Sequence, residues 1–231
     1  YLLKNPVEAI ITTGPPHSMH LIGYRLKKRL HLPWVADFRD LWTKSDYQDQ
    51  LMLSPVADFI HRNQEKKVLI YADRVITIGC TMKKDLENAG AKNVEVITNG
   101  FDEEDLITKP DLTDDKFSIA HIGTLVKTRN PVLLWKVLSG LVKESKEFSS
   151  LLQIKLVGKV DFEVDESINK FGLSHWLQKI SYLPHRDVIL EQQRSQALLL
   201  LINQTHNAKG ILTGKFFEYL AARRPILAMG P

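Results

Sequence analysis

Short apolar runs alternate with longer amphipathic stretches along most of this chain. Strands are predicted from the runs at residues 7–13, 33–38, 73–78, 93–98, 117–122, 152–157, 177–183, 197–202 and 225–228. Helices are predicted at 18–30, 55–71, 81–90, 131–143, 161–171 and 186–194, and a last one carries Lys215 and Glu218. Thr81 is the expected N-cap and Gly90 the expected left-handed stop of the third helix. Such alternation is typical of α/β domains whose parallel sheets are covered on both faces.

A polar, acidic stretch that contains Pro110 divides this pattern in two. A chain of 231 residues suits two domains of about 100 residues each. We therefore predict an N-terminal domain at residues 1–103, a linker at 104–116 and a C-terminal domain at 117–231. The chain has no initiator methionine and stops directly after a predicted strand, so we expect both domains to be incomplete.

Ligands of parallel α/β sheets bind beyond the carboxyl ends of the strands. This rule places the segments 14–17, 37–40, 99–100, 123–129 and 203–218 on binding edges. Two such domains facing each other would form a cleft lined by these segments.

The segment around Lys215 and Glu218 is the most informative one. These residues are three apart on the predicted helix and share one face. Phe216, Phe217, Leu220 and Ala221 are expected to pack on a sheet from the other side. A helix N-terminus, an ammonium for diphosphate and a carboxylate for ribose hydroxyls would together suit a nucleotide. The alternative is an exposed Lys–Glu ion pair on an ordinary amphipathic helix.

Two further strand-to-helix loops carry candidate ligands. In residues 123–131, Gly123 permits close backbone approach, and Lys127 or Arg129 could bind phosphate. The alternative is a turn with two solvated cations. In residues 14–20, His17 could contact a ligand oxygen, although a loop histidine is more often simply exposed. His20, in the first helical turn, is the weaker candidate.

Asp37, Arg39 and Asp40 crowd one strand end. Arg39 could simply neutralise the two carboxylates. Alternatively, Phe38 and Trp42 beside these charges could form a sugar-binding surface, because aromatic faces cover sugar C–H groups while carboxylates accept from hydroxyls.

Composition narrows the class of protein. A hydrophobic content of 44% and a charged content of 25% are those of a soluble globular protein. The net charge of +4 fits phosphate-bearing ligands or an anionic membrane surface but is too small to argue for nucleic acid. The single cysteine, Cys80, excludes an internal disulfide, fits a reducing compartment and is expected to pack in the core. The basic run Arg25–Arg29 predicts a solvated helix face, with a membrane-surface role as the alternative.

Several common site motifs are missing from the sequence. It contains no dinucleotide fingerprint and no P-loop. No paired His or Cys spacing indicates a metal, and no G-x-S-x-G elbow indicates a hydrolase. No leader or membrane-spanning run is recognisable.

Taken together, six ordered segments resemble retaining nucleotide-sugar glycosyltransferases of the GT-B fold, in the glycogen-synthase-like and mannosyltransferase-like family four. The segments are 12–18, 33–42, 72–77, 99–102, 121–125 and 214–221. The resemblance implies two Rossmann-like domains with parallel sheets facing across a cleft, the donor being held mainly by the second. It departs from the family pattern at Gly210, where the family often has a first glutamate, at Thr124, where it has an arginine, and at Arg39, where many members have a histidine.

The resemblance also implies roles for individual residues. Glu218 would take the ribose hydroxyls, and Arg129 and Lys215 would neutralise the diphosphate. The implied donor-binding residues are Gly123, Thr124, Arg129, Thr213, Gly214, Lys215 and Glu218; the residues near the transferred sugar are His17, Asp37 and Arg39; the cleft residues are Gly14, Asn99 and Gly100. No cofactor and no metal are expected, since fixed cations and a helix end would stabilise the leaving group.

The implied function is that of an enzyme, a glycosyltransferase that moves a sugar from a nucleotide-diphosphate sugar to a polysaccharide or lipid-linked acceptor. We expect a cytoplasmic protein of cell-envelope polysaccharide biosynthesis, with peripheral association at the cytoplasmic membrane face and no nucleic-acid partner. Two alternatives stand beside it: a nucleotide-sugar epimerase of the same fold, and a degenerate, non-catalytic binding or scaffold protein.

Overall fold

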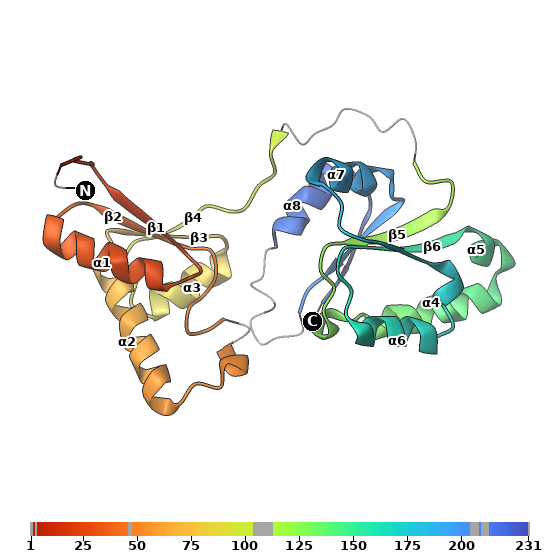
Figure 1. Ribbon diagram of the computed structural model, residues 1–231, viewed down its shortest axis with the longest axis horizontal. Helices are drawn as coiled ribbons and strands as arrows, with labels where there is room; N and C mark the ends of the chain where they lie inside the picture. Colours follow the sequence, from red (N-terminus) through yellow and green to blue (C-terminus); the bar gives the residue numbers. More distant parts are fainter. Residues whose placement is uncertain are drawn as a thin grey trace. The chain divides into compact units, whose positions relative to one another are not determined.

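The computed structural model describes residues 2, 4–45, 48–103, 113–203, 208 and 213–230. The described residues up to Asn99 form one compact unit, and those from Gly100 onward form a second (Figure 1). Each unit has its own parallel sheet and its own hydrophobic core. The alternation of apolar runs and amphipathic stretches therefore predicted the fold class correctly, and the cleft between the two domains stays a prediction.

The first unit is a four-stranded parallel sheet in the order β1-β2-β3-β4. Its strands are β1 (Ile10–Gly14), β2 (Trp34–Phe38), β3 (Arg74–Thr77) and β4 (Val94–Val96), and its helices are α1 (Ser18–Leu30), η1 (Gln48–Leu51), α2 (Pro55–Tyr71) and α3 (Cys80–Asn88). The core lies on the sheet face that carries Ile10, Trp34 and Val75, and α1, α2 and α3 all pack there. On the opposite face Ile11 is exposed. In the described part of this unit, the expected cover on both faces is therefore absent.

Local chemistry explains the ends of these helices. Pro55 stands at the first position of α2, and the hydroxyl of Ser54 caps the helix by accepting from the Ala57 amide. Gly90 follows α3 with a φ of +113°, which a side chain would strain. The predicted N-cap Thr81 is wrong, because α3 begins at Cys80 after an extended Gly79. Cys80 is exposed rather than packed, so that expectation is also wrong.

The second unit is a five-stranded parallel sheet in the order β7-β6-β5-β8-β9. Its strands are β5 (Phe117–Ile122), β6 (Leu152–Val157), β7 (Leu177–Ile180), β8 (Ala197–Leu201) and β9 (Ile226–Met229). Its helices are η3 (Lys127–Arg129), α4 (Val132–Glu144), α5 (Lys146–Leu151), α6 (Phe162–Lys170), η4 (Ser174–Trp176), α7 (His185–Arg194) and α8 (Gly214–Ala221). Figure 1 shows α4 and α6 on one side of this sheet and α7 and α8 on the other. Here the predicted cover on both faces is confirmed.

The entry into the second unit is held by buried charges. The Lys155 side chain on β6 is only 6% exposed, and its ammonium lies 2.7 Å from Asp114 Oδ2 and also pairs with Glu191 of α7. The Ser118 hydroxyl donates to the same Asp114 oxygen at 2.6 Å, and the Asp114 amide donates to Arg194 O. Asp114, within the predicted linker, is thus packed against the second sheet.

Candidate functional site

The carboxyl end of β5 brings Gly123 and Lys215 together. The Lys215 ammonium donates to Ile122 O at 2.8 Å. A Cβ placed on Gly123 would lie 2.1 Å from Lys215 Nζ, and Gly123 has a φ of +121°. Gly158, after β6, packs against the Gly123 backbone: a Cβ on Gly158 would lie 3.1 Å from Gly123 O. The missing side chain of Gly123 therefore leaves the space in which the ammonium sits at the sheet edge.

The Gly123 amide does not face a ligand. It donates to Val157 O at 2.7 Å, which continues the pairing of β5 with β6. Gly123 therefore contributes to the site through its missing side chain. The predicted backbone contact to phosphate would have to come from Thr124, which is exposed at the next position.

Helix α8 is anchored by Tyr219, which the sequence reasoning missed. Tyr219 is fully buried, and its hydroxyl accepts from the Ile122 amide at 3.2 Å. Burial raises the pKa of Tyr219 to about 12, so the phenol stays neutral. Leu220 was expected to pack but is exposed, and the core positions are Tyr219 and Ala222. The bond from β5 to Tyr219 sets the first turn of α8 beside Gly123.

Positive charge concentrates at this edge. Burial lowers the pKa of Lys215, the nearby Glu218 raises it, and the nearby Arg129 lowers it. Lys215 and Arg129 are therefore close enough to repel each other electrostatically. Arg129 Nε is buried and has no hydrogen-bond partner. Burial also lowers the pKa of His121, at the end of β5, to about 4, and Lys215 and Arg129 lower it further. Two cations with unmet capacity beside a neutral histidine favour an anionic ligand.

Glu218 points to a different partner from Lys215. Its carboxylate accepts from Gln192 Nε2 of α7 at 3.2 Å, and it lines a small pocket with Gln192, His185 and Phe101. Among the described side chains, no ion pair joins Lys215 to Glu218. The alternative of a simple exposed Lys–Glu pair is therefore wrong. One helix instead holds an ammonium at the strand end and a carboxylate about one turn away.

The structure does not explain why threonine and glycine stand at the start of α8. Thr213 is the N-cap of α8, but its hydroxyl makes no capping bond and is buried without a partner. Nothing lies within 4 Å of a Cβ built on Gly214, so packing does not demand glycine there. Gly210, where the family often has a glutamate, lies outside the described residues.

In the first unit, the rings of His17 and His20 form a buried cluster beside Gly14. A Cβ on Gly14 would lie 2.8 Å from His20 Nε2 and 2.9 Å from His17 Nδ1. The His17 ring stacks on Trp42 at 5.3 Å, and the His20 ring stacks on Phe38 at 4.5 Å. His17 is buried, so the alternative of a merely exposed loop histidine is wrong. Both of its ring nitrogens are buried, and the Leu41 backbone is close enough to raise the pKa of the ring.

The predicted aromatic sugar surface is also wrong. Phe38 and Trp42 belong to the core, where they stack on the two histidines, and the Trp42 indole donates to His61. The sequence placed both rings correctly beside the charges, but it could not show on which side of the strand end they lie.

Arg39, Asp37 and Asn99 meet at the same sheet edge. Thr13 Oγ1 donates to Asp37 Oδ2 at 2.8 Å, and the other Asp37 oxygen is buried without a partner. Arg39 donates to Asn99 Oδ1. The structure thus joins two predicted site residues that are sixty positions apart in sequence. Gly100 is exposed with open space around it, so its lack of a side chain is not required by packing.

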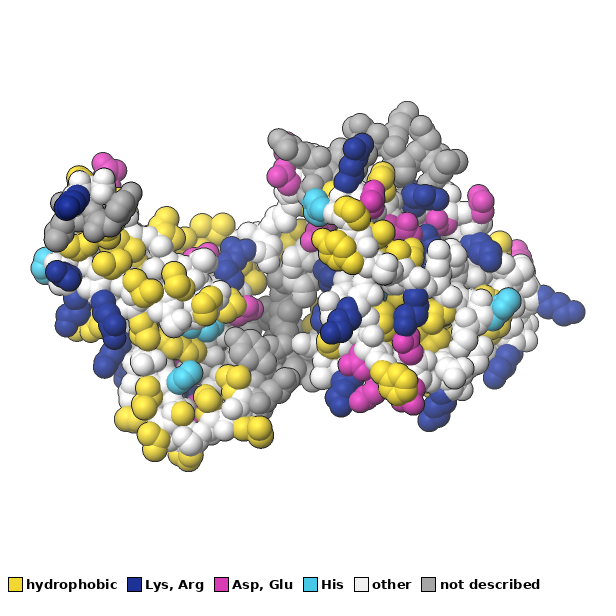
Figure 2. Space-filling view, in the orientation of Figure 1, with side chains coloured by type: hydrophobic (Ala, Val, Ile, Leu, Met, Phe, Trp, Pro, Cys, Tyr) yellow, Lys and Arg dark blue, Asp and Glu magenta, His cyan; other side chains and the backbone are white. Residues whose placement is uncertain are grey.

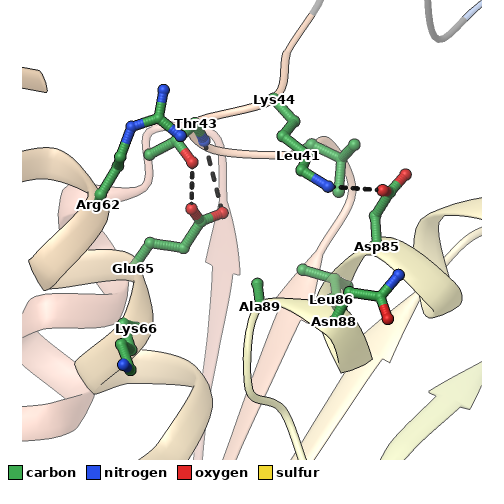
Figure 3. A pocket seen from close by; sticks show the side chains of 10 residues that line it. All are labelled: Leu41, Thr43, Lys44, Arg62, Glu65, Lys66, Asp85, Leu86, Asn88 and Ala89. Carbon is green, nitrogen blue, oxygen red and sulfur yellow. Dashed lines mark hydrogen bonds and ion pairs between the residues drawn. The ribbon is translucent and has the colours of Figure 1, made fainter.

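A pocket of about 260 Å³ that the sequence did not predict lies between α2, α3 and the segment after β2 (Figure 3). Its two carboxylates are engaged: Glu65 accepts from Thr43, and Asp85 pairs with Lys44 at 2.8 Å. Arg62 and Lys66 of α2 also line it. None of the predicted site residues lines this pocket.

Two kinds of site are missing from the described parts of the chain. No group of three or more His, Cys, Asp or Glu side chains there could hold a metal ion. None of the described helices is both long and apolar enough to cross a membrane.

Comparisons with known proteins identify the architecture. No family description matches the sequence, and no curated protein matches it either. A sucrose-phosphate synthase from Thermosynechococcus elongatus is similar with a TM-score of 0.69 and 15% identity, over 99% of this chain and 57% of that one. TarM is similar with a TM-score of 0.70 and 14% identity, over 99% of this chain and 43% of that one. The chain has the GT-B fold.

The GT-B fold also occurs in a less similar neighbour of another activity. A putative UDP-N-acetylglucosamine 2-epimerase from Listeria monocytogenes has a TM-score of 0.53 at 11% identity, over 98% of this chain and 58% of that one. The chain therefore spans about half the length of the solved GT-B structures it resembles. These similarities establish the fold of the chain but not the reaction that it catalyses.

The buried histidines predict a pH dependence of stability. Burial, with the nearby His17 in second place, lowers the pKa of His20 to about 4, and His121 in the second unit also has a pKa of about 4. The unfolded chain binds these protons near pH 6.5 and the folded chain only near pH 4, so stability should be constant above pH 6.5 and fall as the pH drops toward 4. The loss is at most about 3 kcal/mol per histidine.

Urea unfolding at several pH values checks this expectation. Far-UV circular dichroism should give a free energy of unfolding that decreases steadily between pH 6.5 and 4. His121→Gln should reduce that dependence in the second unit. A free energy of unfolding that stays constant across this interval would contradict the buried, neutral state of these rings.

Proposed function

We propose that this chain binds a nucleotide-diphosphate sugar and belongs to a glycosyltransferase that transfers the sugar to a polysaccharide or lipid-linked acceptor. The observation that carries the proposal is the Lys215 ammonium, seated over Gly123 at the carboxyl end of β5. Parallel sheets bind ligands at this edge. An ammonium that is partly desolvated and has no carboxylate partner among the described residues is suited to a diphosphate.

The donor would lie along the first turns of α8. Lys215 and Arg129 would neutralise the diphosphate, with the amide of Thr124 and the N-terminus of α8 at Thr213 and Gly214 as further donors. Glu218 would accept from the two ribose hydroxyls, its other side being held by Gln192. One helix would thus fix the diphosphate and the ribose at a set spacing.

Fixed cations suit the chemistry of this transfer. When the bond between the sugar and the diphosphate breaks, negative charge develops on the leaving oxygen. Lys215 and Arg129 are already in place beside it, so their stabilisation requires little reorganisation. We propose that this arrangement supports transfer without a metal ion and with retention of the anomeric configuration.

The first unit would supply groups near the transferred sugar. His17 has two buried ring nitrogens, Asp37 has one carboxylate oxygen without a hydrogen-bond partner, and Arg39 is oriented by Asn99. Burial lowers the pKa of His17, with the Leu41 backbone opposing this in part, so the ring is neutral at pH 7. A neutral imidazole can accept from and donate to sugar hydroxyls, and a carboxylate such as that of Asp37 can accept from them. We propose that this unit faces the acceptor.

The cellular setting is part of the same proposal. A polysaccharide or lipid-linked acceptor would place the protein in cell-envelope biosynthesis, in the cytoplasm and at the cytoplasmic face of the membrane. The structure of TarM from S. aureus was solved in complex with UDP, and that fold neighbour supports a nucleotide donor here.

Epimerisation is the second candidate, because a putative epimerase has a similar fold. The two reactions differ in their need for an acceptor. Incubating the protein with a nucleotide sugar alone should give at most slow hydrolysis for a transferase. Inversion at one sugar centre, detected by NMR, would favour the epimerase and overturn the transferase.

Glu218→Ala tests the donor site directly. The variant should lose one charge-assisted contact to ribose, worth about 1.5–3 kcal/mol, or roughly a tenfold to 150-fold weaker affinity. Thermal-shift titration with a panel of nucleoside diphosphates measures this, because a ligand of the folded state raises apparent stability. Glu144→Ala, at the exposed end of α4, is the matched control and should bind like the parent chain. Equal affinities for Glu218→Ala and the parent would remove Glu218 from the site.

A further inference from the structure

Helix α2 exposes apolar side chains on the face turned away from the core. Val56, Phe59 and Ile60 follow helical spacing and share that face, and Phe59 is 66% exposed. Leu51 and Met52 directly precede the helix and are also exposed, Met52 by 89%. We call Leu51, Met52, Val56, Phe59 and Ile60 the α2 patch. Figure 2 shows hydrophobic side chains gathered over this end of the first unit.

The α2 patch is unusual for a surface helix. The opposite face of α2 already buries Val68 and Leu69 in the core, so the apolar residues outside are not required for folding. A surface helix normally carries polar residues on its solvent side, and contiguous exposed apolar side chains mark interaction sites. The backbone of Met52 is also strained, because its φ is +44° and left-handed backbone angles cost energy for any residue with a side chain.

Two lysines continue the face of α2 that carries the α2 patch. Lys66 and Lys67 follow Phe59 and Ile60 by two helical turns, so they lie on the same side of the helix, and both are exposed. The two acidic residues of α2 are engaged elsewhere: Asp58 pairs with Arg62 at 2.7 Å, and Glu65 is buried against Thr43. The exposed face of α2 is therefore apolar at its N-terminal half and cationic at its C-terminal half.

We propose that the α2 patch is a docking surface for an anionic lipid bilayer, with Val56, Phe59 and Ile60 entering the interface and Lys66 and Lys67 meeting the headgroups. Helices that lie in a membrane interface combine apolar side chains with lysines in this way. A second copy of the chain fits less well, because it would account for the apolar side chains alone, whereas an anionic bilayer also accounts for Lys66 and Lys67. The basic run of α1 is a weaker candidate: Lys27 pairs with Asp73, and Lys28 lies over the rings of Tyr24 and Tyr71.

Vesicle co-sedimentation of the whole chain tests the proposal. The chain should bind vesicles of phosphatidylcholine mixed with phosphatidylglycerol, bind phosphatidylcholine alone much more weakly, and lose affinity as salt is raised. Phe59→Gln with Ile60→Gln should weaken binding at least about tenfold, since these side chains would no longer leave water. Phe162→Gln is the matched control, because Phe162 is 71% exposed on α6 of the second unit and does not belong to the α2 patch.

A charge series tests the second half of the patch. Each lysine near an anionic surface contributes about fivefold, so Lys66→Gln with Lys67→Gln should weaken binding about thirtyfold. Lys136→Gln with Lys143→Gln changes the net charge equally on α4 and should have little effect. The proposal would be overturned if the parent chain did not bind anionic vesicles. It would also be overturned if the patch variants bound them as tightly as the parent.

The remaining outcome points to another occupant. If the parent is a dimer by analytical ultracentrifugation and Phe59→Gln with Ile60→Gln makes it monomeric without changing vesicle binding, the α2 patch is a contact between copies, and the lipid proposal is wrong. No nucleotide or sugar is present in these assays. Their failure therefore leaves the donor site and its Glu218 test untouched.

Discussion

Lys215→Met should abolish most nucleoside-diphosphate binding while leaving the fold intact. The ammonium that sits over Gly123 at the β5 edge would be replaced by an apolar side chain of similar length. A charge-assisted contact to phosphate is worth about 1.5–3 kcal/mol, so affinity should fall roughly tenfold to 150-fold. Unfolding stability without ligand should change by less than about 1 kcal/mol, because the lost bond to Ile122 O is offset by removing a charge that burial disfavours.

Isothermal titration calorimetry and urea unfolding separate these two effects. Lys143→Met, an exposed lysine on α4, is the control and should change neither quantity. If Lys215→Met unfolds the second unit, Lys215 is a structural residue. If it binds nucleoside diphosphates as tightly as the parent, the ammonium does not contact them.

Lys155→Met should destabilise the second unit by about 3–5 kcal/mol, the usual cost of removing one partner from a buried ion pair. The substitution removes the ammonium that Asp114 and Glu191 share, whose side chains are only 9% and 14% exposed. Asp114 then keeps only the half-exposed Arg194, whose Nε lies 4.0 Å from Asp114 Oδ1. The free energy of unfolding, from urea denaturation at pH 7, measures the effect.

The neighbouring pair of Lys179 and Asp165 provides the control for that experiment. It spans a similar distance, 2.6 Å, but is exposed to solvent. Lys179→Met should therefore cost less than about 1 kcal/mol. Adding Glu191→Gln to Lys155→Met should recover part of the loss, because one unpaired carboxylate is removed. Equal losses for Lys155→Met and Lys179→Met would show that burial does not govern this cluster.

The sequence predicted the elements well because each is marked by local chemistry. Apolar runs such as Ala197–Leu201 are typical of buried parallel strands. Because ligands bind where parallel strands end, the same pattern also pointed to Gly123 and Lys215, and the structure brings these two together.

The sequence failed where burial depends on distant residues. His17 is covered by Phe38 and Trp42, which belong to another strand and the segment after it, so local spacing could not reveal that all three are buried. Tyr219 was missed for the same reason, since its partner is the backbone of β5. The α2 patch was overlooked because amphipathic spacing alone does not say which of two apolar faces meets the core.

The ion pair between Asp114 and Lys155 limits how far the second unit can be truncated at its N-terminal end. Its carboxylate compensates the buried ammonium of Lys155, although it lies before the first strand of that sheet. A fragment that starts at Phe117 would keep every strand and still lose one of the two anions that Lys155 requires, whereas a start at Thr113 would retain both. Independent folding of this half therefore depends on a residue outside its regular secondary structure.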